Sequence, residues 1–97
     1  MRCEGSYNFR SLEKREAGEF INERGLKIKY PEAYKLNVDE QIEGKIYTRT
    51  FVFPITDKNL YDIISTLSLY DPIIITFDVL NNRNNIKLVP VDVICER

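Results

Sequence analysis

The chain has 97 residues, a formal net charge of −1 at pH 7 and a hydrophobic content of 43%. This length allows one hydrophobic core, and the hydrophobic content excludes a disordered chain. The longest aliphatic run, Ile73–Ile75, is far shorter than a membrane span, and residues 1–14 lack the apolar region of a signal peptide. We therefore predict a single domain, residues 1–97, located in the cytoplasm, where its two cysteines stay reduced.

Two predictions compete for the first third of the chain. In one, residues 11–21 form a short amphipathic helix, and residues 1–17 are a flexible or helical N-terminal arm. In the other, a strand begins near Glu19, turns, and returns through Lys27 and Lys29, which alternate with apolar residues. Because this period of two is the pattern of a half-buried strand, the returning strand is predicted and the helix is left open.

The middle of the chain contains two further predicted strands. Residues 34–38 alternate in the same way, and the polar segment 39–44 ends in glycine and is predicted to be a turn. Residues 45–53 form the clearest strand because β-branched and aromatic residues dominate it. One face of this strand has Ile46, Thr48, Thr50 and Val52, and the other has Lys45, Tyr47, Arg49, Phe51 and Phe53.

A helix follows the clearest strand. Pro54 ends that strand, and Thr56 or Asp57 can cap a helix that extends to about Leu69. Its apolar positions have the i, i+3, i+4, i+7 spacing of an amphipathic helix.

A hairpin closes the chain. Its strands begin at Pro72 and at Ile86, separated by the polar loop 81–85, and Pro90 indicates an edge strand or a bulge. Strands, one helix and a closing hairpin are the element order of the OB-fold. We therefore predict a mainly β protein, an OB-like barrel of five strands with one helix between strands 3 and 4. The alternatives are an SH3-like barrel and an α+β open antiparallel sheet with one covering helix.

Several segments resemble small OB-fold single-stranded-DNA-binding proteins of Gram-positive phages and mobile genetic elements. The segments are Gly18-Glu19-Phe20, Tyr34-Lys35-Leu36-Asn37-Val38-Asp39-Glu40, Leu69-Tyr70-Asp71 and Lys87-Leu88-Val89-Pro90-Val91-Asp92-Val93. The resemblance implies a role in replication or transfer of such an element. The chain ends at Ile94-Cys95-Glu96-Arg97 without the acidic tail of many bacterial single-strand binders, so recruitment of partners through such a tail is not expected.

Catalysis is not expected. The chain has no histidine, and its four glycines are scattered rather than grouped in a phosphate-binding loop. Asp39, Glu40 and Glu43 lie in the predicted turn without the ligand spacing of a calcium loop. We predict no enzymatic activity, no cofactor and no metal site.

Basic and aromatic residues are interleaved in the middle third, where residues 24–58 include seven basic and five acidic side chains. Single-strand binders combine cations along the backbone with rings on which bases stack. The predicted stacking residues are Tyr30, Tyr34, Tyr47 and Phe51, and the predicted phosphate-contacting residues are Lys27, Lys29, Lys35, Lys45, Arg49 and Arg83. In the alternative interpretation Phe51 and Phe53 point into the core, and the sequence does not decide which face of this strand is exposed.

Two functions remain open at this stage. The first is binding of single-stranded DNA with little sequence preference, although the sequence does not distinguish DNA from RNA as the ligand. The second is that of a small accessory subunit that docks on a replication polymerase, primase or helicase. The near-neutral charge and the six tyrosines favour protein–protein contacts of this second kind.

Overall fold

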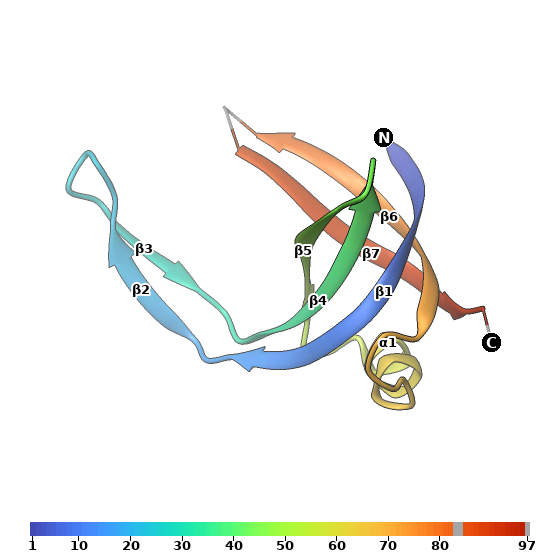
Figure 1. Ribbon diagram of the computed structural model, residues 1–97. Helices are drawn as coiled ribbons and strands as arrows, with labels where there is room; N and C mark the ends of the chain where they lie inside the picture. Colours follow the sequence, from blue (N-terminus) through green and yellow to red (C-terminus); the bar gives the residue numbers. More distant parts are fainter. Residues whose placement is uncertain (83–84, 97) are drawn as a thin grey trace.

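The computed structural model describes residues 1–82 and 85–96 and is mainly β. Its elements are β1 (Arg2–Arg15), β2 (Gly18–Ile21), β3 (Lys27–Tyr30), β4 (Ala33–Ile42), β5 (Lys45–Pro54), α1 (Lys58–Ser65), β6 (Pro72–Asn82) and β7 (Asn85–Cys95). Five strands form an antiparallel sheet in the order β5-β4-β1-β6-β7, and β2 and β3 form a separate hairpin. The sheet is strongly curved, with α1 at one end of it (Figure 1).

β1 is the central strand of the sheet. Its first half pairs with β6 and its second half pairs with β4, and the side chains of Tyr7 and Phe9 are buried between them. The hypothesis of a helix over residues 11–21 is therefore wrong, and residues 1–17 are not a flexible or helical arm. Leu12 lies opposite Leu36 of β4, so its apolar side chain belongs to a strand ladder rather than to a helix face.

β2 and β3 form an arm, residues 18–30, that projects from the main sheet (Figure 1). The predicted returning strand is confirmed as β3, and Gly25 at the turn has a φ of 77°, a conformation that glycine adopts without steric cost. The Asn22 side chain accepts hydrogen bonds from the backbone N–H groups of Arg24 and Leu26, at 2.9 Å each. Because of the arm, the radius of gyration is 14.6 Å, against about 13 Å for a compact chain of this length.

β4 and β5 form a hairpin with a two-residue turn. Glu43 and Gly44 have φ values of 51° and 80°, as hairpin turns that match the strand twist require. β4 continues through Ile42, so the turn is shorter than the predicted segment 39–44. Phe51 and Phe53 of β5 are buried in the core.

The helix α1 begins as predicted and ends early. The Asp57 carboxylate caps it by accepting a hydrogen bond from the Leu60 N–H at 3.2 Å. It ends at Ser65 rather than near Leu69, because the Ser65 and Thr66 hydroxyls donate to carbonyls of the preceding turn and compete with helix continuation. Within residues 1–82 and 85–96, no helix has the length and apolar content needed to cross a bilayer.

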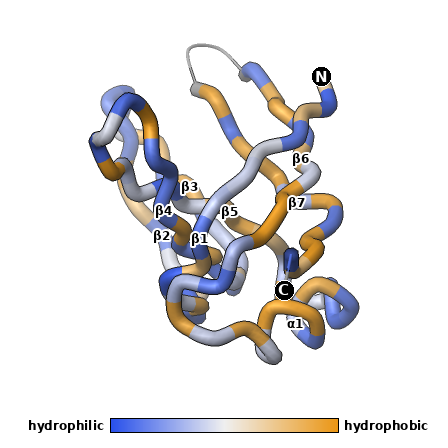
Figure 2. The backbone as a smooth tube through the Cα atoms, turned by 45° about the vertical axis from the view of Figure 1, so that its right-hand side comes forward, coloured by the Kyte–Doolittle hydropathy of each residue, from blue (hydrophilic) through white to orange (hydrophobic). Residues whose placement is uncertain are grey.

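β6 and β7 complete the sheet. Their register shifts between Thr76 and Phe77, next to Pro90, so the last strand is both an edge strand and bulged, as Pro90 indicates. Hydrophobic stretches of β6, β7 and α1 are visible in Figure 2. The core consists of Tyr7, Phe9, Leu36, Val38, Phe51, Phe53, Leu60, Ile64, Ile73, Ile75, Phe77 and Val93.

The two edge strands come close to each other without closing the sheet. β5 and β7 are in contact, yet in the described part of the chain no strand ladder joins them. The molecule is therefore a mainly β protein with an open antiparallel sheet and one covering helix, which agrees with the predicted alternative of an α+β open antiparallel sheet. The predicted closure of the five strands into an OB-like barrel is not confirmed.

Candidate nucleic-acid interface

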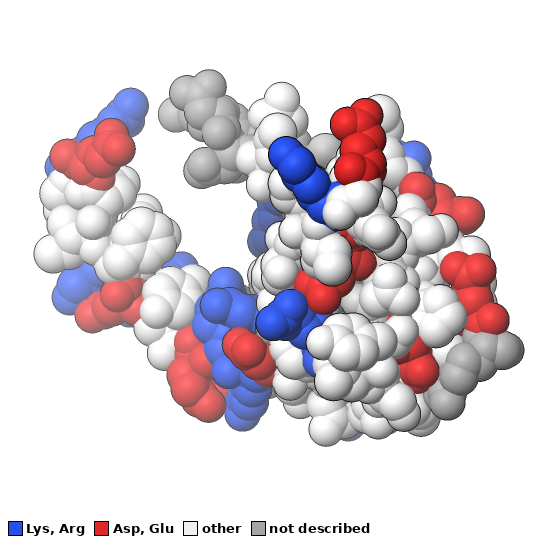
Figure 3. Space-filling view, viewed as in Figure 1, with Lys and Arg blue, Asp and Glu red and all other residues white. Residues whose placement is uncertain are grey.

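A cleft of about 410 Å³ lies where the arm joins the main sheet. β1 contributes Arg15 to its wall, β3 contributes Lys29 and Tyr30, and β7 contributes Lys87. Figure 3 shows a deep hollow between the arm and the body of the molecule, with both basic and acidic side chains near the base of the arm. The one carboxylate among the lining residues, that of Glu32, is 3.5 Å from Lys14 Nζ. The cleft is therefore locally basic in a chain of negative net charge.

Arg15 and Tyr30 form the centre of this cleft. The Arg15 guanidinium carbon lies 5.0 Å from the centroid of the Tyr30 ring, a cation–π arrangement. Arg15 Nη2 donates a hydrogen bond to the Pro31 carbonyl at 3.0 Å. Arg15 Nε is buried and has no hydrogen-bond partner among the residues that the structure describes. The guanidinium is thus held in place on one side while part of its donor capacity is unused.

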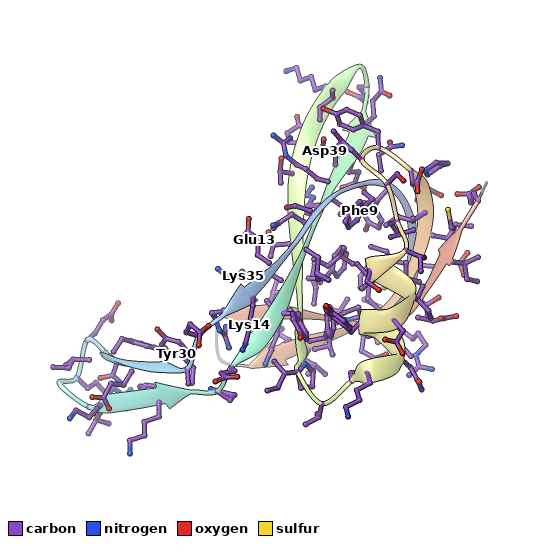
Figure 4. The ribbon with its side chains drawn as sticks, turned by 90° about the horizontal axis from the view of Figure 1, so that it is seen from below. Phe9, Glu13, Lys14, Tyr30, Lys35 and Asp39 are labelled. Carbon is purple, nitrogen blue, oxygen red and sulfur yellow. The ribbon has the colours of Figure 1, made fainter. Side chains whose placement is uncertain are left out.

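Glycine at position 18 allows the Tyr30 ring to lie across the arm. Gly18 pairs with Tyr30 in the β2–β3 ladder, and a Cβ atom on Gly18 would lie 2.4 Å from Tyr30 Oη. The centroid of the Phe20 ring, also on the arm, is 6.3 Å from that of Tyr30. Figure 4 shows Tyr30 at the base of the arm. The two predicted residues Lys29 and Tyr30 are therefore brought together here with Arg15 and Lys87.

Three other predicted residues form a second cluster at the opposite end of β5. Lys45 and Tyr47 are exposed, and Arg49 lies 5.8 Å above the Tyr47 ring. Arg49 Nε donates a hydrogen bond to Glu40 Oε2 at 3.0 Å, so its charge is already paired. Burial and the nearby Glu40 carboxylate raise the pKa of Tyr7, a core residue of β1. From the length of the strand, this cluster lies about 20 Å from the cleft.

Two predicted stacking residues, Phe51 and Tyr34, have rings that pack against other aromatic rings of the protein. Phe51 is fully buried, so its prediction as a stacking residue is wrong: its ring packs against Tyr7 and Phe77, at centroid distances of 5.5 and 5.2 Å. The Tyr34 ring is stacked on Tyr61 of α1 at 4.8 Å, so one of its faces is already covered.

The remaining predicted cations do not join the cleft. Lys27 lies near the turn of the arm, with its Nζ 3.4 Å from Glu19 Oε1. Lys35 lies opposite Glu13 on the outer face of the main sheet, where Figure 4 shows both. Arg83 lies outside the described residues.

The outer face of β1, β4 and β5 is largely polar, a feature that was not predicted from the sequence. Asn37 Nδ2 donates to Ser11 Oγ at 3.0 Å, and Thr50 Oγ1 donates to Asn37 Oδ1 at 2.8 Å. Asp39, assigned above to a turn, lies in β4 and accepts from Arg10 and Thr48. The alternation of residues 34–38 stops at the three consecutive polar residues Asp39, Glu40 and Gln41, so the local pattern has no signal for the second half of β4.

A pocket of opposite charge lies between α1 and β7. It has a volume of about 610 Å³, and its lining includes the carboxylates of Asp57, Asp62 and Asp92 and no Lys or Arg. Across the part of the chain that the structure describes, no group of three or more acidic or cysteine side chains is arranged to hold a metal ion. This pocket would repel a phosphate backbone, whereas the cleft at the base of the arm would attract one.

Comparison with known proteins gives no family for this chain. No family model, curated protein or solved structure matches it. The function is therefore inferred from the geometry of this structure alone.

Proposed function

We propose that the protein binds single-stranded DNA along the cleft at the base of the arm. The observation that supports this most directly is that three cations, Arg15, Lys29 and Lys87, line one cleft together with Tyr30, and that Arg15 lies over the Tyr30 ring. A single-stranded nucleic acid offers what such a site recognises, namely phosphates for the cations and unpaired bases for the ring. In the cell this binding would support replication or transfer of a phage or mobile element.

The order of the strands supports an OB-like interpretation of the open sheet. In the OB-fold, a five-stranded and partly open barrel, the face of strands 2 and 3 and the loops 1–2 and 4–5 bind oligonucleotides. Counted in chain order, strands 2 and 3 of the main sheet are β4 and β5. Loop 1–2 contains the arm, and loop 4–5 is the connection between β6 and β7. The arm is then a hairpin inserted in the first loop, and the cleft lies next to the expected ligand surface.

Binding of labelled oligothymidine, measured by fluorescence anisotropy, tests this proposal. We expect saturable binding to an oligomer of about 30 nucleotides that weakens from low to physiological salt, because phosphate contacts release counterions. Arg15→Ala is expected to weaken binding about tenfold, since it removes a cation and the support of the Tyr30 ring. Lys58→Ala removes the same charge from the start of α1 and is expected to leave affinity nearly unchanged.

Two results would contradict the proposal. The first is an absence of binding at micromolar protein and low salt. The second is an equal loss of affinity for Arg15→Ala and Lys58→Ala, which would place the contact elsewhere.

Gly18→Ala tests the role of Tyr30 through the residue that pairs with it in the β2–β3 ladder. The added methyl group would overlap the Tyr30 ring, which is displaced because it is only partly buried. We expect the affinity for oligothymidine to fall about fivefold, part of the energy of one stacked base, while the thermal midpoint stays nearly constant because the arm lies outside the core. An unchanged affinity together with an unchanged midpoint would exclude Tyr30 from the contact.

A second candidate function rests on the apolar surface of the arm. Phe20, Ile21, Leu26 and Ile28 are 38 to 70% exposed on an arm that projects from the sheet. Exposed apolar side chains grouped in this way are typical of protein contacts. The arm would then dock the chain on a replication polymerase, primase or helicase, and the isolated chain would bind DNA weakly. Weak binding that Arg15→Ala does not change favours this candidate.

A further inference from the structure

A second, smaller pocket lies on the outer face of the main sheet. It has a volume of about 240 Å³ and is lined by Asn8, Asp39, Gln41, Ile46 and Tyr70. Asn8 and Asp39 lie opposite each other on β1 and β4, and Gln41 and Ile46 lie opposite each other on β4 and β5. The pocket is smaller than the roughly 300 Å³ at which sites for drug-sized ligands begin. Its size suits one planar heterocycle.

Tyr70 is held at this pocket in an unusual backbone conformation. Its φ is 68°, in the left-handed region that non-glycine residues rarely adopt. The Tyr70 N–H donates to the Phe9 carbonyl at 2.7 Å, and Asn8 Nδ2 donates to the Tyr70 carbonyl at 3.1 Å. These bonds to β1 fix the strained backbone, yet the residue remains 60% exposed. Strain that the surrounding structure maintains without burying the side chain points to a role in binding.

The polar groups of the pocket have acceptor and donor capacity left. Asp39 is 9% exposed, and its Oδ1 accepts from Arg10 Nη1 at 3.3 Å and from Thr48 Oγ1 at 3.2 Å. Its Oδ2 accepts only from Arg10, at 3.4 Å, within the described residues. The Gln41 amide makes no hydrogen bond in that same part of the chain. A ligand here can therefore donate to the carboxylate and exchange hydrogen bonds with the amide.

We propose that this pocket holds one unpaired base that carries an exocyclic amino group, with cytosine preferred among the pyrimidines. This inference rests on the proposed binding of single-stranded DNA. The Tyr70 ring stacks on the base, as aromatic residues do in single-strand binders. The cytosine amino group donates to the Asp39 carboxylate, a contact that thymine and uracil cannot make because they present a carbonyl oxygen there.

The position of the pocket allows one strand to reach both sites. Val52, in the cleft, and Ile46, in the pocket, are on the same strand β5. Their separation of six residues corresponds to about 20 Å, within the length of the 4 to 16 nucleotides (roughly) that one OB-fold contacts. The cleft would hold the backbone without regard to sequence, and the pocket would add a preference at one nucleotide.

Anisotropy with matched oligomers of deoxycytidine and deoxyuridine, about 12 nucleotides each, tests the inference. Deoxycytidine and deoxyuridine differ only in the polar groups of the pairing edge. At mildly alkaline pH, where cytosine is neutral, the cytidine oligomer is expected to bind about fivefold or more tightly. Asp39→Asn is expected to abolish or reverse this ratio, because its amide can donate to the uracil oxygen. A purely structural role of Asp39 would weaken both oligomers equally.

Two further variants test the pocket independently, in case Asp39→Asn does not fold. Gln41 is exposed, so Gln41→Ala should fold normally and reduce the preference for cytidine. Tyr70→Gly keeps the left-handed backbone without strain and removes the ring, so it should weaken binding of the cytidine oligomer about fivefold. Thermal unfolding of each variant checks the fold.

The outcomes separate this inference from the proposed function. Equal, salt-sensitive binding of both oligomers overturns the pocket and leaves the cleft intact. If neither oligomer binds, the proposed function fails. NMR spectra recorded during titrations with free cytidine and free uridine then test whether the pocket binds the base. Shifts of the Asn8 and Gln41 side-chain amides with cytidine alone support the pocket, and their absence overturns it.

Discussion

Replacing Phe51 by alanine is expected to lower the free energy of unfolding by about 3 to 5 kcal/mol. The Phe51 side chain is 0% exposed and contacts the rings of Tyr7 on β1 and Phe77 on β6. Its removal leaves a cavity between strands that cannot close without moving the ladder. Because domains of this size have total stabilities of about 5 to 15 kcal/mol, the loss should be evident as a lower urea midpoint with an unchanged slope.

Tyr47→Ala is the matched control for this prediction. Tyr47 is on the same strand and the same face as Phe51, but it is 43% exposed and lies beyond the core. We expect its removal to cost less than about 1 kcal/mol. A similar loss of unfolding free energy in both variants would contradict the conclusion that the core covers Phe51 but not Tyr47.

The strands with a clear local pattern could be predicted from the sequence. β3 and the first half of β4 have an apolar residue at every second position, and β5 is rich in β-branched and aromatic residues. β1 could not be predicted in this way, because its register shifts between Phe9 and Ser11. Such a bulge moves the inward-facing side chains from odd to even positions, so the segment loses its period of two and resembles a helix.

The face of β5 could not be decided because neither alternative holds for the whole strand. Phe51 and Phe53 are covered by the core, whereas Lys45 and Tyr47 on the same face extend beyond it. Alternation shows which side chains share a face, but it does not show how far the opposing elements extend over that face. This information depends on contacts between strands that are distant in the sequence.

The candidate cleft was only half predictable for the same reason. Lys29 and Tyr30 are adjacent in the sequence and stand out as a basic and aromatic pair. Arg15 was missed because it lies at the end of β1, whose structure the local pattern left open. Lys87 reaches the cleft only because the curvature of the sheet brings β7 against β5. Composition therefore predicted a basic and aromatic surface, and the topology determined which basic and aromatic residues line the cleft.

The double substitution Lys29→Ala and Lys87→Ala is expected to have the largest effect on DNA binding. Each lysine that contacts a phosphate adds about 0.7 to the slope of log affinity against log salt for a single strand. Removal of both should therefore reduce this slope by about 1.4. Affinity for oligothymidine at low salt should fall by more than either single substitution causes. Anisotropy titrations at several salt concentrations measure both quantities.

A second double variant, Lys27→Ala and Lys58→Ala, controls for charge alone. Both doubles remove two lysines and change the formal net charge from −1 to −3, so any long-range repulsion of DNA is matched. Lys27 is paired with Glu19 on the arm and Lys58 begins α1, and neither lines the cleft. The control should therefore keep nearly the full salt slope. If the two doubles reduce the slope equally, net charge governs the binding, and the cleft is not the site at which the strand is held.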